Sequence, residues 1–339
     1  MNLLRAHSTS QLQPAQANGY QLTAALFLRL LALIFFSAFA SLAIQIEGLA
    51  GSQGILPVSE ALDKNLAYWG NTAFWHFPSL FWINSSDFML ITTTYLGCLI
   101  SILFFFNILP RISLIILLVL YLSLSYAGQI FMNFQWDTLL MEAGFLAIFL
   151  SPHSRYSIWL FRWLLFRLRF LSGISKLVTQ DPSWSGLTAV VLYFEVQPLP
   201  NWLSWYAHQL PEWLLMSATA LTLLIEIVVP FMMFLPRRYR FIAAWLTIAL
   251  QVLIMLTSNH NWINLLTIAL CLFLFDDQAL ERVVPIRLKS WLLSKPLPFN
   301  RERKFYKPAM LILGSFILFI SSVQIYEMLI YQRIEGRVG

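Results

Sequence analysis

The sequence predicts an all-α protein, a polytopic transmembrane helix bundle of about nine spans with interfacial aromatic loop segments. Of its 339 residues, 59% are hydrophobic and 11% are charged, whereas a soluble domain has roughly 25% charged residues. The mean hydropathy is +0.69, and the apolar residues form runs close to the ~20 residues that cross a bilayer. The net charge of +6 gives no indication of nucleic-acid binding, because basic residues of membrane proteins collect in cytoplasmic loops.

Nine apolar segments are predicted to span the membrane. Two of them, Thr138–Leu150 and Ile158–Leu177, are interrupted by polar residues that must face protein. Thr138–Leu150 is the least secure, and a re-entrant segment is the alternative. In chain order the nine are Ala24–Ile46, Phe88–Leu109, Ser113–Gly128, Thr138–Leu150, Ile158–Leu177, Leu214–Leu235, Phe241–Thr257, Asn261–Phe275 and Ala309–Tyr331.

These spans divide the chain into five parts. Residues 1–20, rich in Ser, Gln and Ala, are expected to form a disordered cytoplasmic tail. The bundle core takes residues 21–275, an amphipathic basic linker 276–308, the last transmembrane helix 309–331 and a short outer tail 332–339. We expect the linker to be solvated or to touch lipid.

The charges of the loops predict the orientation. Pro236–Arg240 has three arginines, and Asp276–Lys307 has eight Lys and Arg against four acids. Glu47–Asp87 has one lysine against four acids, and Thr179–Trp213 has none against three. The positive-inside rule then places the N-terminus in the cytoplasm and the C-terminus on the far side. The last two loops are rich in tryptophan, which predicts a common aromatic cap on the outer side.

One predicted span carries an unusual row of basic residues. Arg162, Arg169 and Lys176 follow each other at intervals of seven, so they share one face of a helix. Arg167 lies off this stripe, on another face. We expect Lys176 to reach toward the outer membrane interface.

Two glutamates are the expected partners of this stripe. Gln135, Thr138 and Glu142 share a helical face, and Glu226 lies in a later span. Because intramembrane charges are usually paired, Glu142 and Glu226 are predicted to neutralise part of the stripe. Asp137 is expected at the outer membrane edge. Three roles stay open for this polar interior: salt bridges that hold the bundle, a cavity for a lipid headgroup, quinone-like molecule or client segment, and proton or ion translocation.

The sequence contains no recognised catalytic motif, so the catalytic residues are unknown and a non-enzymatic role is favoured. No metal site is predicted, because no two histidines have ligand spacing. A second group of candidates lies in an outer loop and would line the mouth of a pocket; the alternative is a turn packed on the membrane surface. These outer-loop candidates are Tyr193, Glu195, Gln197, Pro198 and His208.

Five segments together are distinctive: GLAGSQGILPV, FQWDTLLMEAGFLAIFLSP, FRLRFLSGISKL, YFEVQPLPNWLSWYAHQLPEW and FLPRRYRF. Spread from about residue 40 to about residue 277, they resemble the lipase maturation factor family of membrane proteins. Distant similarity to the membrane domain of vitamin K-dependent gamma-carboxylases accompanies this. Where the family has His-(Tyr/Phe)-Glu, this chain has Tyr193-Phe194-Glu195, so no imidazole role is expected there.

The resemblance implies an integral membrane protein that helps exported proteins, such as a lipase, to mature without catalysis of its own. Animal members reside in the endoplasmic reticulum and continue into a long luminal domain, whereas this sequence ends at Gly339. The short format favours a bacterial member in the inner membrane, with the endoplasmic reticulum membrane as the eukaryotic alternative. The expected partners are the lipid bilayer and an exported client.

The carboxylase similarity implies a different class of function. In this reading the chain is a membrane enzyme or binding protein that acts on a lipid-soluble cofactor or anionic lipid in a polar intramembrane cavity. Arg162, Arg169 and Lys176 would then bind the anionic group. No cofactor is predicted otherwise; a lipid or quinone-like ligand belongs to this alternative only.

Overall fold

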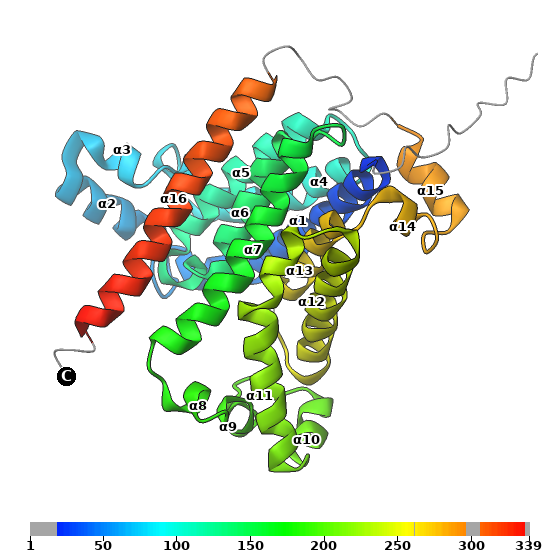
Figure 1. Cartoon of the computed structure of the whole chain (residues 1–339). Coiled ribbons are helices and arrows are strands. Elements are labelled where there is room, and N and C mark those ends of the chain that lie inside the picture. Colours follow the sequence, from blue (N-terminus) through cyan, green and yellow to red (C-terminus); the bar gives the residue numbers. More distant parts are fainter. Residues whose placement is uncertain (1–18, 261, 296–305, 336–339) are drawn as a thin grey trace, which may run out of the picture.

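The computed structural model describes residues 19–260, 262–295 and 306–335, and every regular element in these ranges is a helix (Figure 1). The α-helices are α1 (Gln21–Ala50), α2 (Val58–Trp69), α3 (Ala73–His76), α4 (Asp87–Phe105), α5 (Pro110–Ala127), α6 (Gln135–Ile148), α7 (Arg155–Val178), α8 (Pro182–Ser185), α9 (Ala189–Val196), α10 (Trp202–His208), α11 (Glu212–Ile227), α12 (Arg237–Thr257), α13 (Ile263–Cys271), α14 (Asp277–Leu280), α15 (Ile286–Leu293) and α16 (Tyr306–Glu335). The 3-10 helices are η1 (Gly70–Thr72), η2 (Leu80–Trp82), η3 (Gln129–Met132), η4 (Val229–Phe234) and η5 (Leu272–Leu274).

The all-α membrane bundle is confirmed, but the count of nine spans is not. Within the described ranges, five helices are long and apolar enough to cross a membrane, namely α1, α4, α5, α12 and α16; a sixth span results if α10 and α11, bent by 110°, form one. The other predicted segments are present as helices, yet α6 has 14 residues, α13 has nine, and α7 carries five basic residues. The protein is therefore a multi-pass membrane protein whose core also contains short and charged helices.

Two boundaries differ from the prediction for local reasons. The segment Leu214–Leu235 is not one helix: α11 ends at Ile227 and η4 follows, because Pro230 has no N–H to donate to the helix. The last helix, Tyr306–Glu335, is longer than the predicted span at both ends. Residues 1–18 of the predicted tail and 296–305 of the linker lie outside the described residues.

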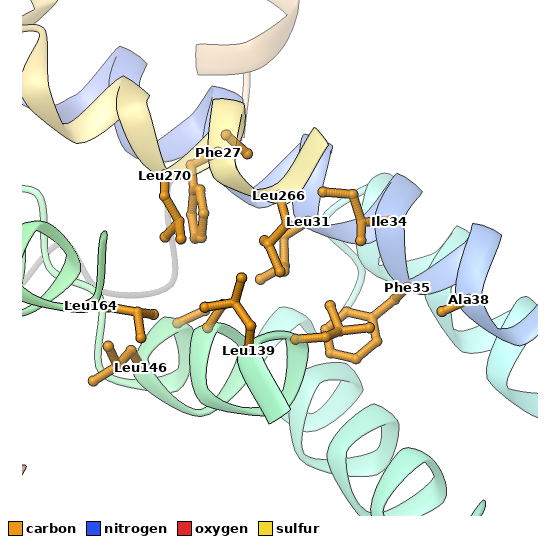
Figure 2. Packing of buried hydrophobic residues seen from close by; sticks show 14 of the residues in the cluster. Phe27, Leu31, Ile34, Phe35, Ala38, Leu139, Leu146, Leu164, Leu266 and Leu270 are labelled. Carbon is orange, nitrogen blue, oxygen red and sulfur yellow. The ribbon is translucent and has the colours of Figure 1, made fainter. Parts of the chain in front are cut away.

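α1 runs through the middle of the bundle and supplies much of its core. Figure 2 shows Phe27, Leu31 and Phe35 of α1 directed at side chains of α6 and α13. A Cβ atom on Gly97 of α4 would lie 2.2 Å from the ring of Phe39, so only glycine permits this approach of α4 to α1. Small residues serve the same purpose in other membrane bundles, where close backbone approach replaces the hydrophobic effect as the source of affinity between helices.

The helices that overlap the predicted spans run alternately between two ends of the bundle. We call the end at which α1, α7 and α12 begin the basic end, because Arg155, Arg237 and Arg240 lie there. The opposite end, which carries α2, α3 and α8–α10, is the aromatic end. There Ser52, after α1, donates to the Asp87 carboxylate at the start of α4, with an Oγ–Oδ2 distance of 2.6 Å.

Two adjacent aspartates tie the basic end together. The N-cap position of α1 has no side-chain cap of its own, and Asp277 accepts hydrogen bonds from the backbone N–H groups of Gln21 and Thr23 at 2.7 and 3.0 Å. Asp276 accepts two bonds from Arg237, at 2.6 and 2.9 Å. The predicted solvated linker is thus wrong for its first residues: Asp276 is 1% exposed and Asp277 5%.

The prediction that the two tryptophan-rich loops form a common aromatic cap is also wrong. The α2–α3 region and the α8–α10 region lie apart in Figure 1, and each forms its own cluster. In the first, Trp82 donates to the carbonyl of Phe77 at 2.7 Å and Trp69 stacks on His76. The second presents exposed Trp202 and Trp205.

The ion pair between Asp276 and Arg237 predicts that the stability of the protein depends on pH. Burial raises the pKa of Asp276, but hydrogen bonds from Arg237 and from the Ala279 N–H, with the charges of Arg237 and Arg240, outweigh this and hold the pKa below its usual 3.8. A depressed carboxyl pKa stabilises the fold above the unfolded value and ceases to do so as pH falls through the folded value. We expect the thermal midpoint in detergent to fall below about pH 4.

Asp276→Asn should lower the midpoint at neutral pH and show a smaller acid-dependent fall. The matched control is Glu60→Gln, since Glu60 belongs to a surface pair with Lys64 and its side chain is 62% exposed. A midpoint for Asp276→Asn that equals the wild-type value at neutral pH would show that the tie does not stabilise the bundle.

Candidate functional site

The candidate site is organised by α7, which carries Arg155, Arg162, Arg167, Arg169 and Lys176. A cation near the bilayer centre costs roughly 3 kcal/mol or more unless it finds a partner. The acceptors that α7 meets on each side therefore decide how the surrounding helices are placed.

The α11 side of α7 contains a closed ion cluster. Glu226 accepts from Arg169 Nη2 at 2.6 Å and from Lys176 Nζ at 2.6 Å. Ser172 lies within reach of the same carboxylate, at 3.4 Å. The side chains of Glu226 and Arg169 are 5% and 7% exposed. The Lys176 side chain is 21% exposed. One buried carboxylate thus neutralises part of the charge of a buried arginine and a partly buried lysine.

A glycine lets the two helices come close enough for this cluster. Gly173 lies between the levels of Arg169 and Lys176, and a Cβ atom there would be 2.6 Å from Ile227 Cγ1 and 2.8 Å from Glu226 Cβ. Any larger residue would push α11 away, and the carboxylate would leave its two cations.

The opposite side of α7 is open. Glu142 of α6 pairs with Arg167, and Arg167 also donates to Ser321 of α16 at 3.3 Å. Two adjoining cavities of about 180 and 250 Å³ share Glu142, Leu164 and Arg167. We call them together the α6–α7–α16 cleft. Its first half is walled mainly by apolar residues of all three helices, such as Phe316 of α16, and its second half is more polar.

The structure therefore distributes the predicted residues differently from the expectation. Gln135, Thr138 and Glu142 do line one cavity together. However, Glu142 forms its ion pair with Arg167, which lies off the predicted stripe, and not with a residue of the stripe. Arg162 and Arg167 are five positions apart, which is about 140° of rotation on a helix, so they face different neighbours.

At the two ends of the basic stripe, Arg162 has partners that were not expected, whereas Lys176 pairs with one of the two expected glutamates. Arg162 donates to the Phe273 carbonyl at 2.9 Å and to the Tyr20 hydroxyl at 2.6 Å. The ammonium group of Lys176 is held by protein groups, including the carbonyl and hydroxyl of Ser172 at 3.0 and 2.9 Å. It turns back to Glu226 and lies 5.2 Å from the ring centre of Trp184.

Asp137 was expected at an exposed edge and is instead buried, with 2% exposure. It accepts a hydrogen bond from the Tyr121 hydroxyl at 2.5 Å, and its Oδ2 atom is buried without a protein partner among the described residues. The sequence offered one weak signal for this pair: Tyr121 lies among aliphatic and serine residues in α5, which also contains Tyr126 near its end.

The outer-loop candidates do not converge. Tyr193 donates to Ser258 at 2.8 Å and lies 3.2 Å from His260 Nε2, so this histidine takes part although it was not predicted. Glu195 and Pro198 are exposed. Gln197 and His208 each have buried side-chain atoms without a partner in the part of the chain described here; these atoms are both amide atoms of Gln197 and Nδ1 of His208.

Comparison with known proteins decides the family. A family model described as the lipase maturation factor transmembrane domain matches residues 22–282. The chain belongs to the lipase maturation factor family. It is 42% identical over 284 residues to lipase maturation factor 2 of Xenopus laevis, 38% over 292 to that of Homo sapiens, and 34% over 286 to lipase maturation factor 1 of Mus musculus.

These alignments cover 76%, 77% and 78% of this chain and 40%, 41% and 50% of the three relatives. The chain therefore spans half or less of the length of each of these lipase maturation factors. The relatives are vertebrate and give no support to a bacterial origin. No solved structure matches. In the described part of the chain, no group of three or more His, Cys, Asp or Glu is placed to hold a metal ion.

The closed cluster predicts a large stability effect. Glu226→Gln leaves the buried Arg169 and the partly buried Lys176 without a counter-charge, and breaking a buried pair in this way costs about 3–5 kcal/mol. We expect a marked fall in the thermal midpoint of the purified protein. Glu142→Gln is the comparison; it should cost less, because Arg167 keeps its bond to Ser321. Equal midpoints for Glu226→Gln and wild type would exclude the cluster as a structural tie.

Proposed function

We propose that this lipase maturation factor family member assists the maturation of an exported client protein at the membrane, and that it does so by binding the client without catalysing a reaction. The observation that carries the proposal is the row of exposed aromatic side chains at the aromatic end. Trp202, Trp205 and Trp213 are 76%, 67% and 68% exposed. Large rigid aromatic side chains are typical anchors of protein interfaces.

The names of the relatives support a lipase as the client. A family domain that matches most of the chain supports the same membrane role. The positive-inside rule supports a cytoplasmic basic end, and the tryptophans then lie on the side where exported proteins fold. That membrane is the endoplasmic reticulum membrane in a eukaryote and the inner membrane in a bacterium.

The client proposal predicts the behaviour of an aromatic variant. The chain is co-expressed with a secreted lipase in cells that lack other family members, and active secreted lipase is measured. The double variant Trp202→Ser with Trp205→Ser should reduce active lipase toward the level without the chain, because the client loses its anchors. Trp75→Ser is the control, since Trp75 is 86% exposed but belongs to the α2–α3 cluster.

Two results would count against the client role. One is a double variant that supports as much active lipase as wild type. The other is a wild-type chain that raises lipase activity no further than an empty vector does. The abundance of each variant in the membrane is measured in parallel, so that a loss of protein is not read as a loss of function.

The α6–α7–α16 cleft favours a second candidate, a binding protein for an amphiphilic molecule such as a lipid or quinone. Its cavities join apolar walls to one ion pair, Glu142 with Arg167. Most ligand pockets combine an apolar lining with few polar groups in this way. α16, which closes the cleft, has only 11% of its apolar stretch buried, so it is the wall most easily displaced.

A cavity-filling variant tests this second candidate without removing a charge. Ile320→Trp should fill the cleft and lower the amount of co-purified lipid or quinone found by mass spectrometry of an organic extract. Ile312→Trp is the control, because Ile312 is 73% exposed on the same helix and does not line the cleft. The candidate fails if both variants carry the same extract as the wild type.

A further inference from the structure

A separate pocket of about 610 Å³ lies at the basic end, where α1, α7 and α12 begin. We call it the basic-end pocket. Its walls include Tyr20, Ser154, Arg155, Arg162 and Arg240. It does not share a residue with the α6–α7–α16 cleft, and neither proposed function uses it.

The pocket is strongly cationic. Three arginines line it and no carboxylate does. The nearest acid for which the structure gives a contact is Asp276, 3.8 Å from Arg240 Nη2, and this carboxylate is already bound by Arg237 at 2.6 and 2.9 Å. The positive charge of the pocket is therefore left largely uncompensated by the protein.

Two of the arginines are held in place by backbone carbonyls. Arg162 Nε donates to Phe273 at 2.9 Å, and Arg240 Nε donates to Leu274 at 2.6 Å. A guanidinium has five N–H donors in a rigid fork, so each keeps further donors. Such fixed arginines suit the bidentate recognition of phosphate.

The remaining wall has donors without acceptors. Ser154 is 2% exposed, and its Oγ is buried with no partner in the described chain. It is the N-cap residue of α7, yet it makes no side-chain cap hydrogen bond. Arg155 follows it, and no hydrogen bond or ion pair joins it to another described residue. The N-terminus of a long helix also favours an anion.

The apolar part of the lining points to a lipid. Trp159 and Ile158 adjoin the arginines in the pocket wall, and Trp159 is 38% exposed, so an acyl chain would find an apolar surface beside the phosphate. The chain's own first 18 residues contain no Asp or Glu and cannot supply the anion. Basic pockets of this kind on the cytoplasmic side of membrane proteins bind anionic headgroups.

We propose that the basic-end pocket binds the phosphate group of an anionic phospholipid. Arg155, Arg162 and Arg240 contact the phosphate oxygens, Ser154 Oγ donates to one of them, and the acyl chains lie along Trp159. This site fixes the depth of the bundle in the leaflet next to the basic end, independently of any client.

Native mass spectrometry of the full chain in detergent tests the site, with phosphatidylglycerol, phosphatidylcholine and inorganic phosphate as separate probes. Wild type should retain phosphatidylglycerol in preference to phosphatidylcholine. Arg155→Gln should reduce the retained phosphatidylglycerol by about fivefold. Arg155 is exposed and makes no bond to another described residue, so this variant is expected to fold.

Arg238→Gln is the control, because it removes the same charge from an exposed arginine near the basic end that does not line the pocket; it should bind as wild type does. Ser154→Ala should weaken binding without changing charge. Equal retention of the two lipids, or equal losses in Arg155→Gln and Arg238→Gln, would overturn the proposal. So would an Arg155-dependent rise in thermal midpoint with inorganic phosphate and none with phosphatidylglycerol, because the occupant would then be free phosphate.

Discussion

The desolvation of the basic residues of α7 is the constraint on which the rest of the structure depends. No other described helix of the bundle carries five cations, and those that lie within the bilayer need partners because the bilayer offers no water. The partners of these cations belong to different elements: Glu226 to α11, Glu142 to α6, and the Phe273 carbonyl to η5. These partners fix three neighbouring elements around α7. Apolar packing alone would determine the positions of these three elements around α7 less strictly. Lipid tails are as apolar as leucine side chains, so an apolar helix face gains no hydrophobic free energy by turning from lipid to protein.

The two faces of α7 differ in what they leave open. At the α11 face, Gly173 brings the backbones together, and the Glu226–Arg169 pair is closed off from its surroundings. At the α6 face, the ion pair lies between two cavities and is covered by α16. A sealed cluster can only hold the bundle, whereas an accessible pair can also meet a ligand. The difference between a structural tie and a binding site therefore follows from the closeness of the helices, not from the identity of the charged residues.

The sequence predicted the membrane bundle, most of its helical segments and the pairing of two glutamates with basic residues, because hydrophobic runs and helical spacing are local properties. It could not predict which cation each glutamate meets. Glu142 and Arg167 are paired through the rotation of α7, which depends on all its neighbours. The capping of the α1 N-terminus by Asp277 could not be predicted either. Asp277 and Gln21 are 256 positions apart in the chain, and the composition around Asp277 indicates a basic linker. The count of nine spans is not confirmed for a related reason: a short or charged helix is tolerated in the core once partners surround it, so apolar length alone does not decide which helices cross the membrane.

α6 illustrates how those partners work. With 14 residues it is about 21 Å long at 1.5 Å per residue, shorter than a bilayer core of about 30 Å. Its two carboxylates, Asp137 and Glu142, are five positions apart, so they point about 140° away from each other. Asp137 binds Tyr121 of α5, and Glu142 binds Arg167 of α7. Each carboxylate thus bonds one side of α6 to a neighbouring helix, and these bonds hold a helix that is too short to be kept in the membrane by its apolar surface alone. This explains why one short apolar segment contains two acids.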